Sequence, residues 1–285
     1  MSRIAVMGCS GRTNNIAGLD HGRANQLGLT LVEMMVAMAL GLLILLAVSS
    51  IYIGSRATFR LQDDNARLQE TGRYALEVLG RSIRQAGFWN LTVNTPPTVT
   101  GFGGTPIIGV DGTGSAPDTV TVQYDGVIGD RDCEGNALGA NAVVQDAYRL
   151  NFVDSNGNGV VDGSEVAELQ CDGNADGTVD HQALVSDIED VQILYGIDTN
   201  SDQSADQYVA TPGNWAQVVS ARVCVQARSP NNVNNAPQRF LNCGGVLGTA
   251  TGGAAFTTAS GTTALRLRRT FVATYNLRNR VTNVP

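Results

Sequence analysis

Residues 25–54 read NQLGLTLVEMMVAMALGLLILLAVSSIYIG, and this stretch decides how the chain is built. Between Leu29 and Ile53 it holds a single charge, Glu33, in an otherwise uncharged and mostly apolar run. At about 1.5 Å per helical residue, the run is long enough to cross a hydrocarbon core of roughly 30 Å. Because a carboxylate is costly at the edge of a bilayer, we expect Glu33 to meet a partner there.

The segment before the run is basic, with these charged residues: Arg3, Arg12, Asp20 and Arg23. Positive charge beside a membrane helix favours the cytoplasmic side, which predicts that residues 1–28 lie there and the C-terminal body lies across the membrane. Translation from Met7 instead of Met1 is an open alternative. An ordinary secretory signal is cleaved after its apolar segment. Here Gly28 stands before that segment, so cleavage between Gly28 and Leu29 would remove the leader and keep the helix.

Gly28, Thr30 and Glu33 stand in the register of a type IV prepilin signature, and the chain resembles a type IV pilin or a related pseudopilin. The resemblance implies that a prepilin peptidase cuts between Gly28 and Leu29 and methylates the new N-terminus at Leu29. It also implies that Glu33 neutralises the N-terminal amine of a neighbouring subunit, a pairing that offsets several kcal/mol of desolvation per ion. The alternative is a plain signal anchor with a stray Glu.

The composition describes a folded chain without a basic surface. Charged residues make up 16% and hydrophobic residues 43% of the sequence, which excludes a disordered tail. The net charge of −7 argues against nucleic-acid binding, which needs a basic face. The 33 glycines, with plentiful Asn, Thr and Ser, suit a loop-rich β domain.

Cysteine usage fits an exported domain. Cys9 lies in the leader, and an even number remains in the body: Cys133, Cys171, Cys224 and Cys243. An even count outside the cytoplasm favours two disulfides. Among the possible connectivities, proximity in the sequence favours Cys133–Cys171 with Cys224–Cys243. The alternatives are free thiols and a zinc site, for which the chain lacks CxxC spacing and offers only His181.

After the apolar run the sequence still has a helical pattern. No Pro interrupts residues 55–87, and apolar residues recur mostly at spacings of three, four or seven, which gives one apolar stripe and one charged face. Gly72 and Gly80 weaken a helix by about 1 kcal/mol each relative to Ala, so these positions allow a bend. Gly87 is a candidate C-terminal cap.

From residue 88 onward the pattern changes to short β runs separated by Gly-rich turns. The best strand candidates are residues 118–126, 142–153, 188–198, 216–228 and 264–278. Alternation in the last two candidates predicts sheet surfaces with one buried face. Residues 98–117 and 229–263 are rich in Gly, Asn and Thr, and they are predicted to be loops.

Together with the resemblance, these segments predict an α+β, pilin-like fold: a long N-terminal helix packed on an antiparallel β-sheet domain with long Gly- and Asn-rich loops. The expected parts are a cytoplasmic leader that is removed (1–28), a transmembrane and filament-core helix (29–54), the amphipathic half of the same helix (55–87) and a β-rich head (88–285). The head is expected in the periplasm before assembly and on the cell surface, in a pilus, afterwards.

Four blocks narrow the resemblance: residues 74–90, 188–209, 215–229 and 268–280. In that order they are similar to the PilW family of minor pilins, although the strand containing Cys224 is usually more purely aliphatic. The family implies a minor pilin that primes type IV pilus assembly and sits at or near the tip, supporting twitching motility and adhesion. Its implied partners are other minor pilins, the major pilin, a PilY-type tip adhesin, the inner-membrane assembly platform and the prepilin peptidase. Two alternatives are a minor pseudopilin of a type II secretion system and a calcium-dependent tethered adhesion module.

Half of the 26 acidic residues lie between 154 and 206, where there is no Arg. Residues 154–165 match an EF-hand calcium loop, in which alternate oxygen ligands converge, a Gly allows the sharp turn and a final Glu binds bidentately. The expected ligands are Asp154, Asn156, Asn158, Val160 through its carbonyl, Asp162 and Glu165. Residues 172–180 and 198–206 repeat part of the pattern, the latter with Asp198, Asn200, Asp202 and Asp206 but without the Gly. The alternative is that these strings are ordinary solvated turns.

The sequence does not indicate an enzyme. His181 is the one histidine of the body and lies in an acidic turn, where a solvated side chain is the ordinary explanation. The chain has no GxSxG, no HExxH and no Gly-rich phosphate loop that opens a helix. Trp89 and Trp215 are expected to pack in the core or at the end of the helix.

Overall fold

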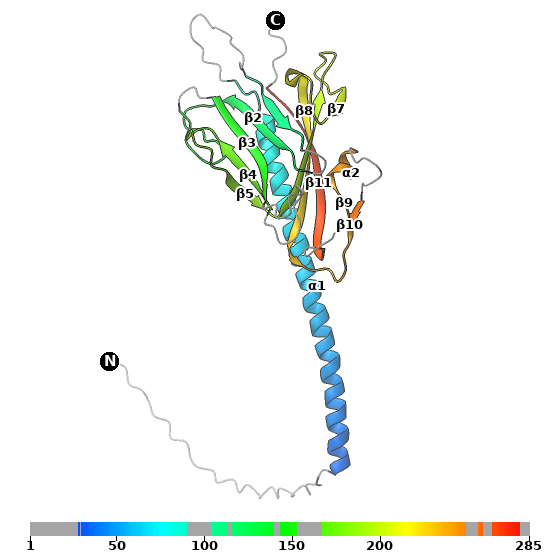
Figure 1. Ribbon diagram of the computed structural model, residues 1–285. Coiled ribbons are helices and arrows are strands. Elements are labelled where there is room, and N and C mark those ends of the chain that lie inside the picture. Colours follow the sequence, from blue (N-terminus) through cyan, green and yellow to red (C-terminus); the bar gives the residue numbers. More distant parts are fainter. Residues whose placement is uncertain are drawn as a thin grey trace, which may run out of the picture. The chain divides into compact units, whose positions relative to one another are not determined.

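The structure is a computed structural model that describes residues 28, 30–89, 104–112, 116–139, 143–152, 167–248, 256–258 and 264–279. The chain divides into two compact units, residues 1–53 and 54–285. Helix α1, Leu31–Gln85, is continuous over 55 residues and contributes to both units (Figure 1). The helix that the sequence predicts over 29–87 is therefore present, with its ends two residues further in.

The part of α1 in the first unit has no buried side chain. Its apolar residues from Leu31 to Ile53 are exposed, and this is the one described helix that is long and apolar enough to cross a membrane. An unburied surface of this length needs an apolar environment that the first unit does not provide.

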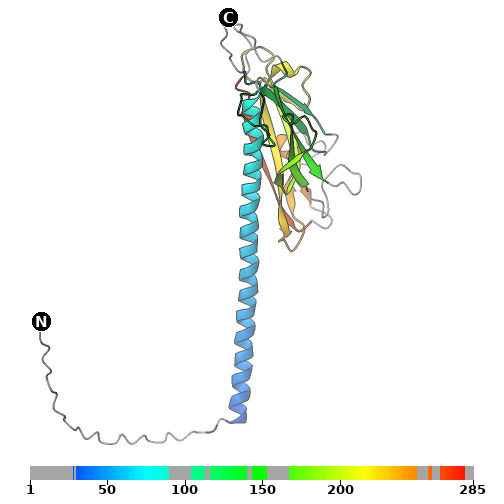
Figure 2. The same cartoon turned by 90° about the vertical axis from the view of Figure 1, so that its left-hand side faces the viewer.

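The part of α1 in the second unit lies along the strands and buries one stripe (Figure 2). The buried positions recur every three or four residues: Asp64, Leu68, Gly72, Ala75, Leu76, Leu79, Gly80 and Ile83. Full burial of one leucine such as Leu79 contributes about 2 kcal/mol. The helix stops before Gly87, whose φ is +69° and whose N–H donates to the carbonyl of Gln123 at 2.8 Å. Gly87 thus fills the left-handed position expected of a residue that ends a helix.

Gly72 and Gly80 are places of close approach, and α1 passes through both without a break. A methyl group on Gly72 would lie 2.1 Å from the ring of Phe271, and one on Gly80 would lie 2.3 Å from the ring of Tyr275. The Tyr275 hydroxyl also donates to the carbonyl of Leu76 at 2.8 Å. The absence of a side chain at these glycines therefore makes room for two aromatic rings. This explains why glycine occurs here although it lowers the stability of the helix.

The first sheet of the head has five strands. In spatial order they are β1 (Ile107–Val110), β2 (Thr119–Asp125), β3 (Val143–Phe152), β4 (Ala167–Gly173) and β5 (Gln182–Ser186), each antiparallel to its neighbour. Tyr148 of β3 connects this sheet to α1 through a hydrogen bond of 2.6 Å with the hydroxyl of Ser82.

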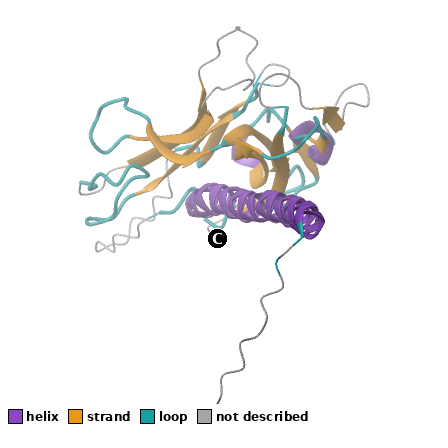
Figure 3. Cartoon of the chain, turned by 90° about the horizontal axis from the view of Figure 1, so that it is seen from below, coloured by secondary structure: helices purple, strands orange, loops and turns teal. Residues whose placement is uncertain are grey.

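The second sheet has four antiparallel strands. Their spatial order is β11 (Arg266–Asn276), β8 (Val218–Asn232), β6 (Ile188–Ile197) and β7 (Gln207–Val209). A short 3-10 helix, η1 (Trp215–Gln217), precedes β8, and the Trp215 ring packs edge-on against Tyr195 with their centroids 4.8 Å apart. Figure 3 shows α1 along one side of the strands.

Strand β9 (Arg239–Leu241), helix α2 (Cys243–Leu247) and strand β10 (Phe256–Thr258) lie next to the second sheet, away from α1 (Figure 1). The disulfide Cys224–Cys243 joins α2 to β8. Leu194 and Leu247 complete a small apolar cluster around that bond. The second sheet is thereby covered on both faces, with α1 on one and α2 on the other.

Asp118 joins the two sheets. Its carboxylate accepts the N–H of Ile193 on β6 at 2.7 Å and that of Gly112 at 2.8 Å, while its own N–H donates to the carbonyl of Val191 at 2.8 Å. The side chain is buried, and this burial raises its pKa to about 6. A single carboxylate therefore connects the start of β2 to the middle of the neighbouring sheet.

The five predicted strands correspond to β2, β3, β6, β8 and β11. The prediction was incomplete elsewhere, because β4, β5 and β7 had no candidate and the predicted loops 98–117 and 229–263 contain β1, β9, α2 and β10. The missed elements are mostly three to seven residues long. Strands this short are held by pairing with distant neighbours, so they leave little periodicity in the sequence.

Candidate functional site

The start of α1 is capped by Thr30. The hydroxyl of Thr30 accepts the backbone N–H of Glu33 at 3.2 Å, and its carbonyl accepts the N–H of Met34 at 3.2 Å. Thr-x-x-Glu is the pattern of a capping box, and Glu33 lies in the first turn, near the positive end of the helix dipole. The sequence around Glu33 thus both begins the helix and favours a negative charge there.

Glu33 is exposed and stands among exposed apolar side chains. Leu31, Val32, Met34 and Met35 are each more than half exposed. Of the two residues expected to flank the cleavage, Gly28 is exposed, and Leu29 lies outside the described residues. An ionised carboxylate on an apolar helix surface is available to a cation that approaches through an apolar medium.

The conformation of the acidic loop 198–206 is held by hydrogen bonds from its own backbone to its own side-chain oxygens. Asp198 accepts the N–H groups of Ser201 at 2.6 Å and Gln203 at 2.9 Å. Asn200 accepts the N–H of Asp202 at 2.9 Å, so each oxygen-bearing side chain caps the backbone that follows it. Gln203 stands at the sixth position of the calcium-loop pattern, and its φ is +67°. The backbone thus makes the sharp turn although the usual Gly is absent.

Asp206 closes the same loop. Its carboxylate accepts the hydroxyl of Thr199 at 2.6 Å and the N–H of Thr199 at 2.7 Å, and these bonds lower its pKa. The amide of Asn200 donates to Asp206 at 3.2 Å and to Asp202 at 3.1 Å. Asn200 therefore links Asp202 to Asp206, whereas Asp198 caps the backbone of Ser201 and Gln203. The other calcium loop, 154–165, with Asp154, Asn156, Asn158, Val160, Asp162 and Glu165, lies outside the described residues.

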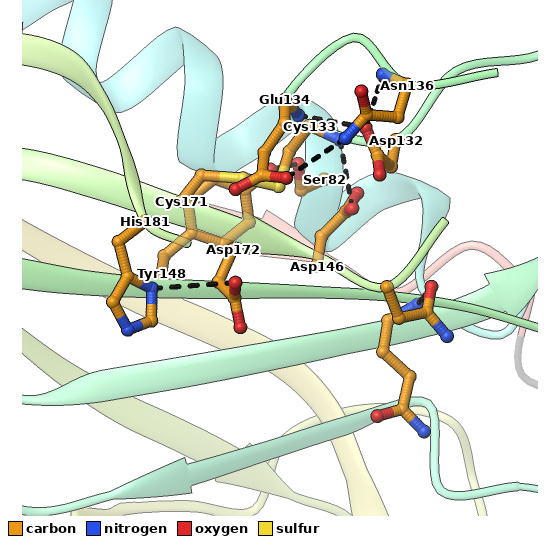
Figure 4. Close-up of a disulfide and its surroundings, with 12 residues drawn as sticks. Ser82, Asp132, Cys133, Glu134, Asn136, Asp146, Tyr148, Cys171, Asp172 and His181 are labelled. Atoms are coloured by element: carbon orange, nitrogen blue, oxygen red, sulfur yellow. Dashed lines mark hydrogen bonds and ion pairs between the residues drawn. A yellow bond between two sulfur atoms is a disulfide. The ribbon is translucent and has the colours of Figure 1, made fainter. Parts of the chain in front are cut away.

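A second group of acids surrounds the disulfide Cys133–Cys171 (Figure 4). Asp146 is buried nearby and accepts the N–H of Cys133 at 3.0 Å and the hydroxyl of Tyr124 at 3.2 Å. Burial raises the pKa of Asp146 to about 6. The disulfide thus anchors the 131–137 loop to β4, and Asp146 fixes the backbone of that loop.

Glu134, Asp172 and Asp180 have carboxylate oxygens that lie within 4.8 Å of one another. Partial burial and the neighbouring negative charges raise the pKa of Glu134. The Nδ1 atom of His181 lies 3.8 Å from Asp172. Glu134 was not among the predicted site residues. The expected disulfide is the signal that points to it, because Glu134 and Asp172 each follow a bonded cysteine.

Both disulfides that sequence proximity favours, Cys133–Cys171 and Cys224–Cys243, are present. The N-terminal segment and the head each match a known family. Residues 23–49 match the prokaryotic N-terminal methylation motif, and residues 152–279 match PilW, the type IV pilus-assembly protein W family.

Together these two matches support a PilW-family pilin with a prepilin signature. The chain has this signature, a long N-terminal helix and an α+β fold with antiparallel sheets. Pilins of this family and fold are structural proteins rather than enzymes, as the sequence indicated.

One solved structure that the chain matches is a type IV-like pilin from Thermus thermophilus. It shares 15% identity with this chain and a TM-score of 0.40, over 78% of this chain and 97% of that one. No curated protein matches the sequence.

Proposed function

We propose that this PilW-family pilin is a minor pilin that primes type IV pilus assembly and sits at or near the pilus tip, supporting twitching motility and adhesion. The observation that supports this most directly is the capped start of α1. There, Glu33 is the single acid of an exposed apolar helix that precedes a head matching PilW.

The first proposed step is cleavage between Gly28 and Leu29, with methylation of Leu29. The basic leader is removed, and the mature helix begins four residues before Glu33. Glu33 then pairs with the N-terminal amine of a neighbouring subunit as the helix leaves the bilayer. The pairing replaces solvation that neither charge has in an apolar medium.

The proposed location follows from the same helix. Residues 29–54 anchor the chain in the inner membrane, with the head in the periplasm, and they become filament core after assembly. The partners in this proposal are other minor pilins, the major pilin, a PilY-type tip adhesin, the assembly platform and the prepilin peptidase.

A deletion strain tests the proposal when it is complemented with wild type, Glu33→Ala or Glu70→Ala. Glu70 is an exposed acid on the other part of α1 and serves as the matched control. We expect loss of surface pili and twitching in the deletion strain and with Glu33→Ala, and full activity with Glu70→Ala. Mass spectrometry of sheared wild-type pili should identify the chain beginning at methyl-Leu29.

Two results would replace the proposal. If the deletion strain keeps pili and twitching but loses protein secretion, the chain is a minor pseudopilin of a type II secretion system. If Glu33→Ala is cleaved and incorporated as well as wild type, the charge-pairing role of Glu33 is wrong.

We also propose that the loop 198–206 binds calcium, which would order an acidic turn rather than catalyse a reaction. The left-handed conformation of Gln203 and the hydrogen bonds from the Asn200 amide to Asp202 and Asp206 support this. Calorimetric titration of the full chain in detergent should give binding heat that Asp202→Asn reduces and Asp63→Asn does not. Absence of heat at millimolar calcium would end this proposal.

A further inference from the structure

Strand β11 is the longest open edge of the head. It has 11 residues, lies at the end of its sheet and pairs only with β8 among the described strands (Figure 1). The other edge strands, β1, β5 and β7, have four, five and three residues. A long edge presents unpaired backbone donors and acceptors to any extended chain beside it.

The register shows which backbone groups of β11 point outward. Asn276 stands opposite Ser220, and the N–H of the next residue, Leu277, donates to the carbonyl of Val219 at 2.9 Å. Hydrogen-bonded and non-hydrogen-bonded pairs alternate along an antiparallel ladder. The backbone groups of Thr270, Val272, Thr274 and Asn276 therefore point away from β8, and within the described residues no backbone bond reaches them.

Strand β9 approaches one end of this edge, where the Thr270 hydroxyl donates to the carbonyl of Leu241. The rest of the edge carries few of the features that usually block strand addition. The stretch from Arg268 to Asn276 has no Pro and no register shift. Val272 is 43% exposed, and Thr274 and Asn276 are exposed beside it. Strand edges that must stay solitary usually carry charges, bulges or Pro along their length.

We propose that β11 is the acceptor for an extended strand from a neighbouring pilin-type subunit, one that carries acidic residues at both ends. The exposed residues Arg269 and Arg278 lie at the two ends of the open stretch. A second β11 is a poor occupant, because antiparallel self-pairing about Ala273 sets Arg268 opposite Arg278, and like charges directly opposite are destabilising. An acid at each end of the incoming strand removes that repulsion and supplies the complementary charge.

A strand of this kind exists in the same fold. The edge strand β5, Gln182–Ser186, stands between Asp180 and Asp187, although in this chain Asp187 already pairs with Arg228 and Arg266 at 3.7 and 3.8 Å. The proposed donor is therefore a related strand in another subunit, whose flanking acids have no such partners. This makes the partner another pilin head rather than a membrane or a nucleic acid. The inference rests on membership of the pilin family and is independent of a position at the tip.

The test uses the full chain in its native cell, with a photo-crosslinking amino acid in place of Val272. We expect a crosslink to an acid-flanked edge strand of another pilin-type subunit, identified by mass spectrometry of the joined peptides. Thr274→Pro removes one outward N–H while the bonds of its neighbours to β8 stay, and it should lower the yield at least tenfold. Thr274→Val keeps the N–H and should leave the yield unchanged.

A second variant guards against misfolding in Thr274→Pro. Arg269→Glu combined with Arg278→Glu reverses the charge at both ends and should also lower the yield at least tenfold, with both disulfides still formed. Crosslinks to a partner helix or to this chain itself, or equal yields from Thr274→Pro and Thr274→Val, would overturn the inference. If a Thr274→Pro strain loses the crosslink but still makes normal pili, strand addition at β11 is not needed for pilus assembly. The proposed function would then stand without this edge.

Discussion

The two parts of helix α1 differ in what their apolar residues contact. From Leu31 to Ile53 the apolar side chains are exposed, whereas from Asp64 to Ile83 a stripe is buried against the head. The backbone is helical throughout, so the two parts differ only in their side chains. The exposed apolar side chains of the first part are the ones that need a membrane or a filament around them. Changes in the second part should alter the stability of the head, while changes in the first should alter only assembly.

The largest expected effect comes from the disulfides of the head. Replacing Cys133 and Cys171 by Ser reopens a loop with a sequence separation of 38, which should lower the free energy of unfolding by about 4 kcal/mol in the chain-entropy model. The shorter Cys224–Cys243 loop should cost about 3 kcal/mol. Urea unfolding of the full chain in detergent, followed by Trp fluorescence, measures both. An equal loss of helicity over the apolar part would contradict the division of α1.

The next effect distinguishes the two parts of α1 directly. Gly72→Val should lower the free energy of unfolding of the head by about 3 kcal/mol, because the added carbons overlap the ring of Phe271. Gly41→Val is the matched control in the first part, since an added methyl there meets nothing within 4 Å. The same urea experiment reads both variants. Similar losses in the two variants would mean that helix propensity, and not the close approach, sets the cost.

A smaller effect concerns pH. Burial raises the pKa of Asp118 and of Asp146 from 3.8 to about 6, so the folded head binds protons more strongly than the unfolded chain. Their contribution is favourable at low pH and is lost as the pH rises through 6. We expect the head to be more stable at pH 5 than at pH 7.5 by about 1 kcal/mol for each group.

Thermal unfolding in EDTA at the two pH values tests this dependence. Asp118→Asn should flatten it, whereas Asp63→Asn, at an exposed site on α1, should not. A head that is more stable at pH 7.5 would show that these carboxylates are stabilised as ions.

The smallest expected effect on the head comes from Glu33. Glu33→Gln should leave the free energy of unfolding of the head within about 0.5 kcal/mol of wild type, because surface changes remote from the core rarely do more. Incorporation into sheared pili should nevertheless fall, since the neutral amide cannot neutralise an amine. Quantitative mass spectrometry against wild type checks this, and unchanged incorporation would count against the pairing.

Sequence reasoning was most successful where the pattern is long. The apolar run from Leu29, the stripe after residue 55 and the alternation in β8 and β11 each extend over many residues, so their periods are clear. Cysteine proximity was sufficient for both disulfides. Short strands such as β5 and β9 could not be found in this way, because their pairing partners lie elsewhere in the chain.

Two sites show why single residues are harder to interpret. Gly72 and Gly80 looked like weak points in a helix, because propensity is a local property while the rings of Phe271 and Tyr275 arrive from the far end of the sequence. The loop 198–206 lacks the expected Gly, yet Gln203 takes the left-handed conformation because the surrounding carboxylates hold the turn. For the glycines the deciding contact comes from a distant part of the chain, and for Gln203 it comes from Asp198 at the start of the same loop.

The two aromatic rings seated at Gly72 and Gly80 also have a mechanical consequence. Because Phe271 precedes Tyr275 in the same order as Gly72 precedes Gly80, β11 runs in the direction of the helix and meets it at two points two turns apart. If force along the helix axis moved α1 relative to the head, both rings would leave their glycines at the same time. Each ring would then collide with helical residues that carry side chains. The two ring contacts therefore resist sliding of the head along α1. Tension on the chain is shared between these two contacts instead of falling on one.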